Sequence, residues 1–280
     1  MSIPRLRELT VDAPADREEA VVAAVYRMGV QGVEVRDAST ANVPAGRVVV
    51  VAWLPPSPVA SRAIRGLRRR LGADVRCTWR DVVITWEAEP AATPIGARFV
   101  VVAPRTDPAL SDPARLPLVL DAHLAFGDGL HPTTVLCVEA LERRYAPVGP
   151  ASVLDVGTGT GILAIVAARL GATRVVAQDI DPLALWATRR HVADNAAAVD
   201  VVDTLPDARF DLVIANLYFA PLLALIPALA ARVATGGELV VSGFNVEARD
   251  RVVTACVAVG LIVREAEERD GWGLLAAVPG

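Results

Sequence analysis

The sequence predicts an α/β protein in two parts: a Rossmann-like domain with a doubly wound, mostly parallel sheet, and a smaller ferredoxin-like α+β domain before it. Three observations predict this. From residue 152 onward, short apolar runs alternate with stretches of helical length, and the first of these runs ends in a glycine-rich loop. Within the first 80 residues, the order is strand, helix, strand, strand, helix, strand. We expect domains over residues 1–88 and 98–280, joined by a linker over residues 89–97.

The elements of the smaller domain follow from apolar alternation and from the residues that end helices. Gly29 and Gly72 lie just past the two expected helices. The expected order is strand Leu6–Val11, helix Pro14–Met28, strands Gly32–Asp37 and Arg47–Trp53, helix Pro58–Leu71 and strand Asp74–Thr78. Arg62, Arg65 and Arg69 share one face of the second helix, which suits either a basic binding surface or, more simply, a solvated face.

Proline and alanine cluster in Glu89–Gly96, the expected linker, and the larger domain begins after it. A strand over Arg98–Ala103 precedes a Pro-rich loop, Pro104–Pro117, and a helix begins at Pro132. The remaining elements alternate. They are strands Ser152–Val156, Arg174–Gln178, Phe210–Ala215, Gly237–Ser242, Leu261–Glu267 and Trp272–Val278, and helices Ile162–Leu170, Pro182–Asn195, Ala220–Val233 and Val246–Val259.

Composition narrows the possible functions. All 28 cationic side chains are arginine, so Schiff-base enzymes and P-loop NTPases, which need a lysine amine, are excluded. The net charge of −4 disfavours general nucleic-acid binding. No apolar run approaches the roughly 18–20 residues of a membrane span, and the charged N-terminus lacks a signal core, so we expect a cytoplasmic protein. The three cysteines are far apart and predict no metal site.

The strongest motif is a glycine-rich loop, Asp155-Val-Gly157-Thr-Gly159-Thr-Gly161, between a strand and a helix. Dinucleotide-binding loops place their third glycine three residues after the second, but that position here is Ile162. Asp155 would repel a pyrophosphate, whereas it suits the ammonium and sulfonium of S-adenosylmethionine. The sequence therefore favours S-adenosylmethionine over NAD as cofactor.

The next strand ends in Gln178-Asp179-Ile180-Asp181-Pro182. A carboxylate at this place can accept hydrogen bonds from both ribose hydroxyls, and we assign Asp179 that role. Asp181, followed by proline, is expected to cap the next helix.

Candidate acceptor residues follow the third strand, in Ala215-Asn216-Leu217-Tyr218-Phe219. The Asn216 side-chain oxygen and a nearby backbone carbonyl could orient an amine, and the two aromatic residues could form a wall. A helix-capping asparagine beside core aromatics is the alternative. His131 is a candidate base in a glycine-rich loop, although a single histidine is more often structural; His123 and His191 are isolated in the sequence.

Taken together, these motifs resemble the PrmA family, class I methyltransferases that modify amino groups of the eleventh protein of the large ribosomal subunit. The resemblance covers about residues 98–278. It rests on Phe126-Gly-Asp128-Gly-Leu-His131-Pro-Thr-Thr134, on Asp155 to Gly161, on Asp179 to Pro182 and on Ala215 to Leu217, with Ser242-Gly243 and Trp272-x-Leu-Leu also in place.

The resemblance implies a function and a set of site residues. Thr134, Asp155, Gly157, Gly159, Gly161, Asp179 and Asn216 would contact S-adenosyl-L-methionine. Asn216 and Leu217 would line the acceptor site, with Asp128 or His131 helping to remove a proton. The small domain would recognise a ribosomal protein. The chain departs from the family pattern at Asp128, where threonine is usual, and at Arg105, where tryptophan is. Because loops and the first domain set specificity, an N-methyltransferase of another protein, of a small-molecule amine or of a nucleic-acid base is the first alternative, and a non-catalytic cofactor-binding module the second.

Overall fold

The computed structural model describes residues 5–26, 28, 33–37, 43–54, 66–67, 69–72, 74–83, 92–104, 112–121, 131–146 and 148–280. The chain divides into two compact units, Met1–Ala88 and Glu89–Gly280.

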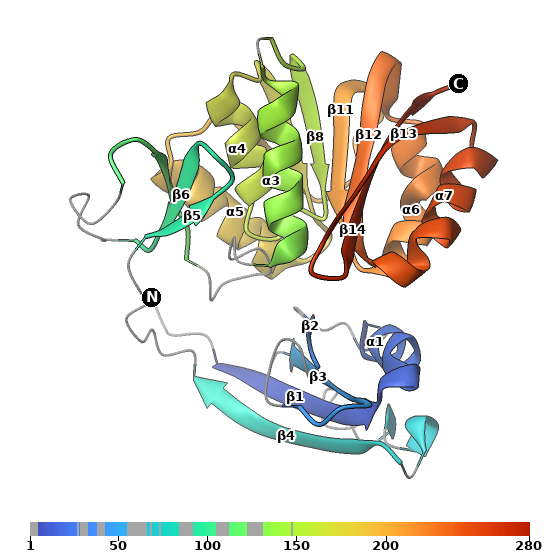
Figure 1. The fold of residues 1–280 in the computed structure, drawn as a ribbon. Helices are drawn as coiled ribbons and strands as arrows, with labels where there is room; N and C mark the ends of the chain where they lie inside the picture. The colour runs from blue at the N-terminus through green and yellow to red at the C-terminus, as the bar shows by residue number, and fades with distance from the viewer. Residues whose placement is uncertain are drawn as a thin grey trace. The chain divides into compact units, whose positions relative to one another are not determined.

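The first unit is an antiparallel sheet of four strands in the order β2-β3-β1-β4 (Figure 1). Its elements are β1 (Arg5–Pro14), α1 (Glu18–Tyr26), β2 (Val33–Arg36), β3 (Arg47–Leu54) and β4 (Arg76–Val83). Residues 66–67 and 69–71, between β3 and β4, are helical. This is the strand order of a split βαβ arrangement, so the predicted small α+β domain is confirmed.

Alternation explains which face of this sheet is buried. Leu9, Val11 and Ala13 of β1 are fully buried, and each lies opposite a buried residue of β3. On the other face of β1, Glu8 pairs with Arg80 of the edge strand β4. Strand β4 is longer than predicted because its polar residues continue the ladder along β1 to Val83. Of the basic face predicted on the second helix, Arg62 and Arg65 lie outside the described residues.

The second unit is built on a seven-stranded sheet in the order β10-β9-β8-β11-β12-β14-β13. All its pairs are parallel except those made by β14, which runs antiparallel to β12 and β13. The strands are β8 (Ser152–Val156), β9 (Arg174–Gln178), β10 (Asp200–Val202), β11 (Phe210–Asn216), β12 (Val233–Asn245), β13 (Leu261–Arg269) and β14 (Trp272–Pro279). The predicted doubly wound sheet is confirmed.

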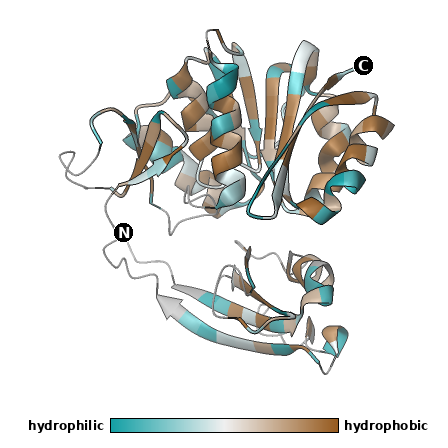
Figure 2. Ribbon diagram, in the orientation of Figure 1, coloured by the Kyte–Doolittle hydropathy of each residue, from teal (hydrophilic) through white to brown (hydrophobic). Residues whose placement is uncertain are grey.

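Two layers of helices cover this sheet. Helices α3 (Pro132–Arg144), α4 (Ile162–Leu170) and α5 (Pro182–Asp194) lie on one face, and α6 (Phe219–Ala230) and α7 (Arg249–Ala258) lie on the other (Figure 1). The strands are hydrophobic because both faces are buried (Figure 2). Successive residues alternate between the two cores: Val153 packs with α3 and α4, and Leu154 packs with α6 and α7.

Short strands are where the structure differs from the prediction. Strand β5 (Thr93–Ile95) lies in the predicted linker, β7 (Leu116–Val119) begins in the predicted Pro-rich loop, and β10 was not predicted. Strands β5 and β7 pair with β6 (Phe99–Val102) in a small separate sheet. Strand β5 contains Pro94 and β7 contains Pro117. Because proline in a sequence predicts a turn or at most an edge strand, neither segment was predicted as a strand.

Arginine–carboxylate pairs connect helix α3 to strands β12 and β13 of the large sheet. Arg144 pairs with Glu238 of β12 and with Glu265 of β13, and Arg143 pairs with Glu267. Arg269 donates two hydrogen bonds, 3.0 and 3.1 Å, to the Glu139 carboxylate. A guanidinium suits this role because its planar donors match a carboxylate in pairs.

A strained residue ends α5, and it generates a stability prediction. Ala196 has φ +48°, and the bonds Ala196 N–H to Ala193 O (3.1 Å) and Ala197 N–H to Val192 O (3.0 Å) form a Schellman motif around it. Ala196→Gly should raise the free energy of unfolding by roughly 0.5–1 kcal/mol, because glycine adopts this conformation without a steric penalty. Urea titration measures the change.

The same substitution one turn earlier is the control. Ala193 is exposed and inside α5. Ala193→Gly should lower the free energy of unfolding by about 1 kcal/mol, through helix propensity. Two changes of the same sign would contradict the explanation.

Candidate active site at the carboxyl ends of the sheet strands

The site residues meet where the direction of the sheet's connections reverses. From β8 the chain proceeds outward through β9 to β10, then returns to β11 on the other side of β8. Strands β8 and β11 are parallel neighbours, with Asp155 opposite Ile214 and Val156 opposite Ala215. The glycine-rich loop and Asn216 therefore emerge side by side. Ligands bind at such a switch point in open α/β sheets.

The glycine-rich loop needs glycine for its backbone conformation and for space. Gly157, Gly159 and Gly161 have φ of +71°, +58° and +86°. A Cβ on Gly157 would lie 2.2 Å from a methyl carbon of Leu217. The N–H groups of Gly157 and Thr158 both donate to the Gln178 carbonyl, at 2.8 and 3.0 Å, which fastens the loop to the end of β9.

Asp179 holds this loop from the neighbouring strand. Its carboxylate accepts hydrogen bonds from the N–H groups of Gly159 and Asp181, both at 3.0 Å. Each oxygen keeps acceptor capacity for a ligand hydroxyl. Asp181 caps α5 by accepting from Leu183 N–H at 2.8 Å, with Pro182 in the first turn, so the predicted cap is confirmed.

Asp155 is almost fully buried, and its two oxygens differ. Oδ2 accepts from the Thr158 hydroxyl at 2.6 Å and from Ala164 N–H, in the first turn of α4, at 3.2 Å. Oδ1 is buried without a partner. Burial raises the pKa of this carboxyl to about 7; the charge of Asp179 also raises it, and the two hydrogen bonds oppose the shift.

Buried polar atoms without partners gather at the predicted site. Within the described part of the chain there are four such side-chain atoms: Thr134 Oγ1, Asp155 Oδ1, Asn216 Oδ1 and Arg249 Nε. The first three belong to predicted site residues. Buried polar atoms are almost always satisfied in native proteins, so these three oxygens fit a ligand that donates hydrogen bonds.

Asn216 is not a helix cap. The residue that caps α6 is Tyr218, and no side-chain hydrogen bond is made there, so the capping alternative for Asn216 is wrong. Leu217 donates its N–H to Ser242 O at 3.1 Å. A Cβ on Gly243 would lie 2.1 Å from the Leu217 carbonyl oxygen, so only glycine lets β12 pass this close.

Comparison with known proteins decides the family. The model of the family described as ribosomal protein L11 methyltransferase (PrmA) matches residues 78–278. The chain belongs to the PrmA family.

Individual relatives agree in both sequence and structure. A ribosomal protein L11 methyltransferase of Pelotomaculum thermopropionicum is 33% identical over 96% of this chain and 97% of its own length. One from Geobacter metallireducens is 42% identical over 70% of this chain, which spans 65% of that relative. The crystal structure of the ribosomal protein L11 methylase from Lactobacillus delbrueckii subsp. bulgaricus has a TM-score of 0.61 and 29% identity, covering 68% of this chain and 99% of that one.

PrmA proteins are class I methyltransferases, and their cofactor is S-adenosyl-L-methionine. The residues present fit that molecule. Its methionyl end carries an ammonium and a sulfonium, which suit the unpartnered oxygen of Asp155. The positive-φ glycine loop allows close approach of a ligand to the backbone, and Asp179 lies at the tip of β9.

His131 occupies the start of α3. Its Nδ1 lies 2.8 Å from the Thr133 hydroxyl and accepts from Thr133 N–H at 3.3 Å, which makes it the helix cap. Its ring meets Trp272 edge to face, with centroids 4.7 Å apart. A part in proton removal stays a prediction. Phe126 and Asp128 lie outside the described residues.

The sequence interpretation missed His191. This histidine is isolated in the sequence, but in the structure it is fully buried and makes two hydrogen bonds, one of them to the glycine-rich loop. The available signal was the spacing of Thr188, His191 and Asn195 on one face of α5, where an amphipathic helix would place apolar residues.

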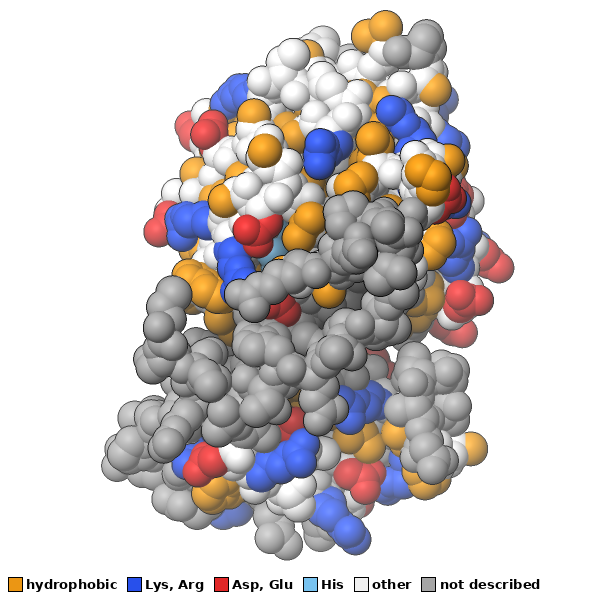
Figure 3. Space-filling model, turned by 90° about the vertical axis from the view of Figure 1, so that its left-hand side faces the viewer, with side chains coloured by type: hydrophobic (Ala, Val, Ile, Leu, Met, Phe, Trp, Pro, Cys, Tyr) orange, Lys and Arg blue, Asp and Glu red, His pale blue; other side chains and the backbone are white. Residues whose placement is uncertain are grey.

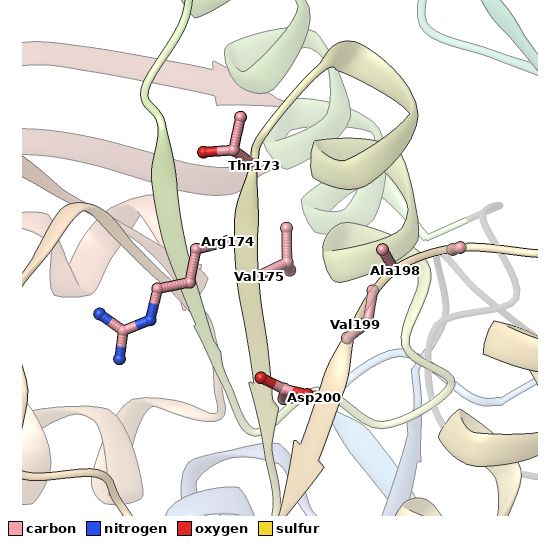
Figure 4. Close-up of a pocket in the computed structure, with 7 residues that line it drawn as sticks. Thr173, Arg174, Val175, Ala198, Val199 and Asp200 are labelled. Carbon is pink, nitrogen blue, oxygen red and sulfur yellow. The ribbon is translucent and has the colours of Figure 1, made fainter.

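Other features of the larger unit lie away from this site. A pocket of about 410 Å³ lies at the amino end of β9, and Arg174 and Asp200 are among its lining residues (Figure 4). Asp179 follows the opposite end of β9. In the described residues, no cluster of His, Cys, Asp or Glu could hold a metal, and no helix is long and apolar enough to cross a membrane.

The Asp155 carboxyl predicts how cofactor binding depends on pH. A cation beside the carboxylate favours its ionised form, whereas the cofactor-free protein holds its pKa at about 7. Affinity should therefore rise by roughly tenfold between about pH 6 and pH 8, with proton release on binding. Calorimetry in buffers of different ionisation enthalpy measures both.

Asp155→Asn is the control. The amide keeps an acceptor for Thr158 and Ala164 but does not titrate. Its affinity should be weaker at pH 8 and should retain only the pH dependence of the ligand's own amino group. A variant with the full wild-type pH dependence would remove Asp155 from the cofactor site.

Proposed function

We propose that this protein transfers methyl groups from S-adenosyl-L-methionine to amino groups of ribosomal protein L11. Its family and its relative from Pelotomaculum thermopropionicum are ribosomal protein L11 methyltransferases, which supports this substrate. The observation that carries it within the site is the buried, unpartnered Asn216 Oδ1 at the end of β11, next to the glycine-rich loop. An amide oxygen in this place accepts a hydrogen bond from an amine.

Orientation is the main task of these residues. The bound cofactor supplies a methyl group activated by its sulfonium. Asn216 Oδ1 and the Leu217 carbonyl accept the two N–H bonds of the acceptor amine, which directs the nitrogen lone pair toward that methyl group. Alignment of this kind contributes several kcal/mol to catalysis, on the order of a well-placed intramolecular reaction.

The acceptor amine must lose a proton before it reacts. An unperturbed lysine has a pKa of about 10.4, and burial beside apolar residues lowers it. Leu217 and Tyr218, both partly buried, follow Asn216 and contribute to such surroundings. His131 at the start of α3 and Asp128 in the preceding segment are the groups we assign to proton removal.

The two units divide the work in this proposal. The domain over residues 98–280 binds the cofactor and carries out the transfer, the domain over residues 1–88 recognises the substrate protein, and residues 89–97 connect them. On the face drawn in Figure 3, arginine and acidic side chains of the described residues are interspersed, without the single-sign stripe of a nucleic-acid binder. We place the enzyme in the cytoplasm, where its substrate is made.

Intact-mass spectrometry tests the proposal directly. Ribosomal protein L11 from a strain that lacks this gene should gain whole methyl increments of about 14 Da when incubated with the protein and S-adenosyl-L-methionine. The number of increments gives the number of methyl groups. No gain, with cofactor binding confirmed, would move the search to another amine.

Asn216→Ala tests the acceptor site. We expect at least a roughly 100-fold loss of kcat, with the cofactor Kd changed only severalfold and the thermal midpoint nearly unchanged, because the variant removes an interaction made mainly with the amine. Asn245, exposed at the end of β12, is the matched control, and Asn245→Ala should keep kcat within about twofold. Near-normal turnover by Asn216→Ala would remove Asn216 from the acceptor site.

A further inference from the structure

Three buried polar side chains form a single stripe along α5 and its C-cap residue, Asn195. Thr188, His191 and Asn195 follow one another at spacings of three and four residues, so they project from the same helix face. Thr188 and His191 are fully buried, and Asn195 is 3% exposed. Each of them bonds to the backbone of a segment distant in sequence.

On one side, the stripe holds the glycine-rich loop. The Thr188 hydroxyl donates to the Gly159 carbonyl at 2.9 Å, and His191 Nδ1 lies 2.7 Å from the Thr160 carbonyl. A Cβ on Gly161 would lie only 2.9 Å from the Thr188 methyl carbon, so α5 also packs closely against the loop at this glycine. Two consecutive carbonyls of the loop thus accept from α5.

On the other side, the stripe holds the end of β7. Asn195 bonds both backbone groups of Val119, accepting from its N–H at 2.9 Å and donating to its carbonyl at 2.7 Å. His191 Nε2 accepts from Asp121 N–H at 2.9 Å. The residue between them, Leu120, donates instead to Val102 of β6 at 3.0 Å. The α5 side chains therefore occupy the place of a neighbouring strand.

His191 is the member of the stripe that reaches both sides. A ring nitrogen that accepts from Asp121 N–H carries no proton, so the proton is on Nδ1, where it donates to Thr160 O. The charged groups around the ring are Asp121, Asp194 and Arg190. Arg190 lies 3.9 Å from the Asp121 carboxylate and 3.7 Å from that of Asp194. Burial is the largest influence and lowers the pKa of His191, which keeps the ring neutral.

We propose that His191 is a positioning residue that fixes the cofactor loop at Thr160 to the end of β7 at Asp121. Asp121 directly precedes residues 122–130, the stretch that contains Phe126 and Asp128, and the chain then enters α3 at His131. Through its two ring nitrogens, the neutral His191 side chain connects the Thr160 carbonyl of the cofactor loop to the backbone of Asp121. The turnover part of the test rests on the proposed function; the binding part needs only the cofactor.

Three substitutions separate the two sides of the stripe. Thr188→Val keeps the shape but removes the bond to Gly159, and it should raise the cofactor Kd severalfold with kcat at saturation within about twofold. Asn195→Leu removes the bonds to Val119, and it should lower kcat about tenfold with little change in the cofactor Kd. His191→Phe removes both ties and should change both quantities.

A conservative variant and a stability control complete the set. His191→Gln offers one acceptor and one donor, so it should recover part of both losses and give a measurable protein if His191→Phe does not fold. Ala193→Gly, two residues from His191 on an exposed face, destabilises the same helix without touching either tie and should leave Kd and kcat unchanged.

The tautomer of the His191 ring can be measured by NMR, and it reports whether the ring makes both hydrogen bonds. In ¹⁵N-labelled protein, the histidine signal absent from His191→Gln should show a proton on Nδ1 and stay neutral below pH 6.5. The proposal is overturned if this signal shows the other tautomer. It is also overturned if the His191 variants lose stability, as Ala193→Gly does, while the cofactor Kd and kcat stay at wild-type values. Failure to methylate ribosomal protein L11 with the expected Kd changes intact would overturn the substrate assignment and leave this proposal standing.

Discussion

The contact between Gly157 and Leu217 is the constraint on which the site depends. It joins the segments that follow β8 and β11. These two strands are more than fifty residues apart in the sequence but are neighbours in the sheet. With no Cβ at Gly157, the glycine-rich loop lies in direct contact with the segment that carries Asn216, the residue proposed to hold the acceptor amine. Gly243 of β12 permits a second close approach, because its missing Cβ leaves room for the Leu217 carbonyl. Methyl transfer needs donor and acceptor within van der Waals reach, and in the proposed site the absence of side chains at Gly157 and Gly243 would permit this close approach.

Asp155 shows how one side chain serves the fold and the ligand together. Oδ2 belongs to the fold, because it accepts hydrogen bonds from Thr158 and from Ala164 in the first turn of α4; Oδ1 has no protein partner and is the oxygen that we propose faces the cofactor. A buried carboxylate without a counter-charge is costly, and the raised pKa is the expression of that cost. In the proposed cofactor complex, a cation beside Oδ1 would favour the ionised carboxylate and offset part of this cost.

The sequence predicts the centre of the larger domain best. Ser152–Val156, Ile162–Leu170 and Arg174–Gln178 form the predicted elements at the predicted bounds, because each apolar run is bounded by glycine or by charged residues that end it. Most of the residues proposed to bind the cofactor stand out in the sequence for the same reason: Asp155, the loop glycines, Asp179 and Asn216 belong to local motifs at strand ends, and their role stays a prediction. Strands β5, β7 and β10 have three or four residues, too few for any periodicity to show. The partners of His191 are backbone atoms 31 and 70 residues away, so the polar spacing along α5 signals a buried polar face but does not identify what the histidine bonds to.

The arginine pairs that fasten α3 have a consequence for an enzyme that modifies amines. A lysine at Arg143, Arg144 or Arg269 would carry charge equally well, but in its neutral form it would be a nucleophile of the same kind as the substrate. A guanidinium keeps its proton throughout the pH range of a folded protein. With no lysine in the chain, the protein offers the cofactor no side-chain amine of its own to methylate.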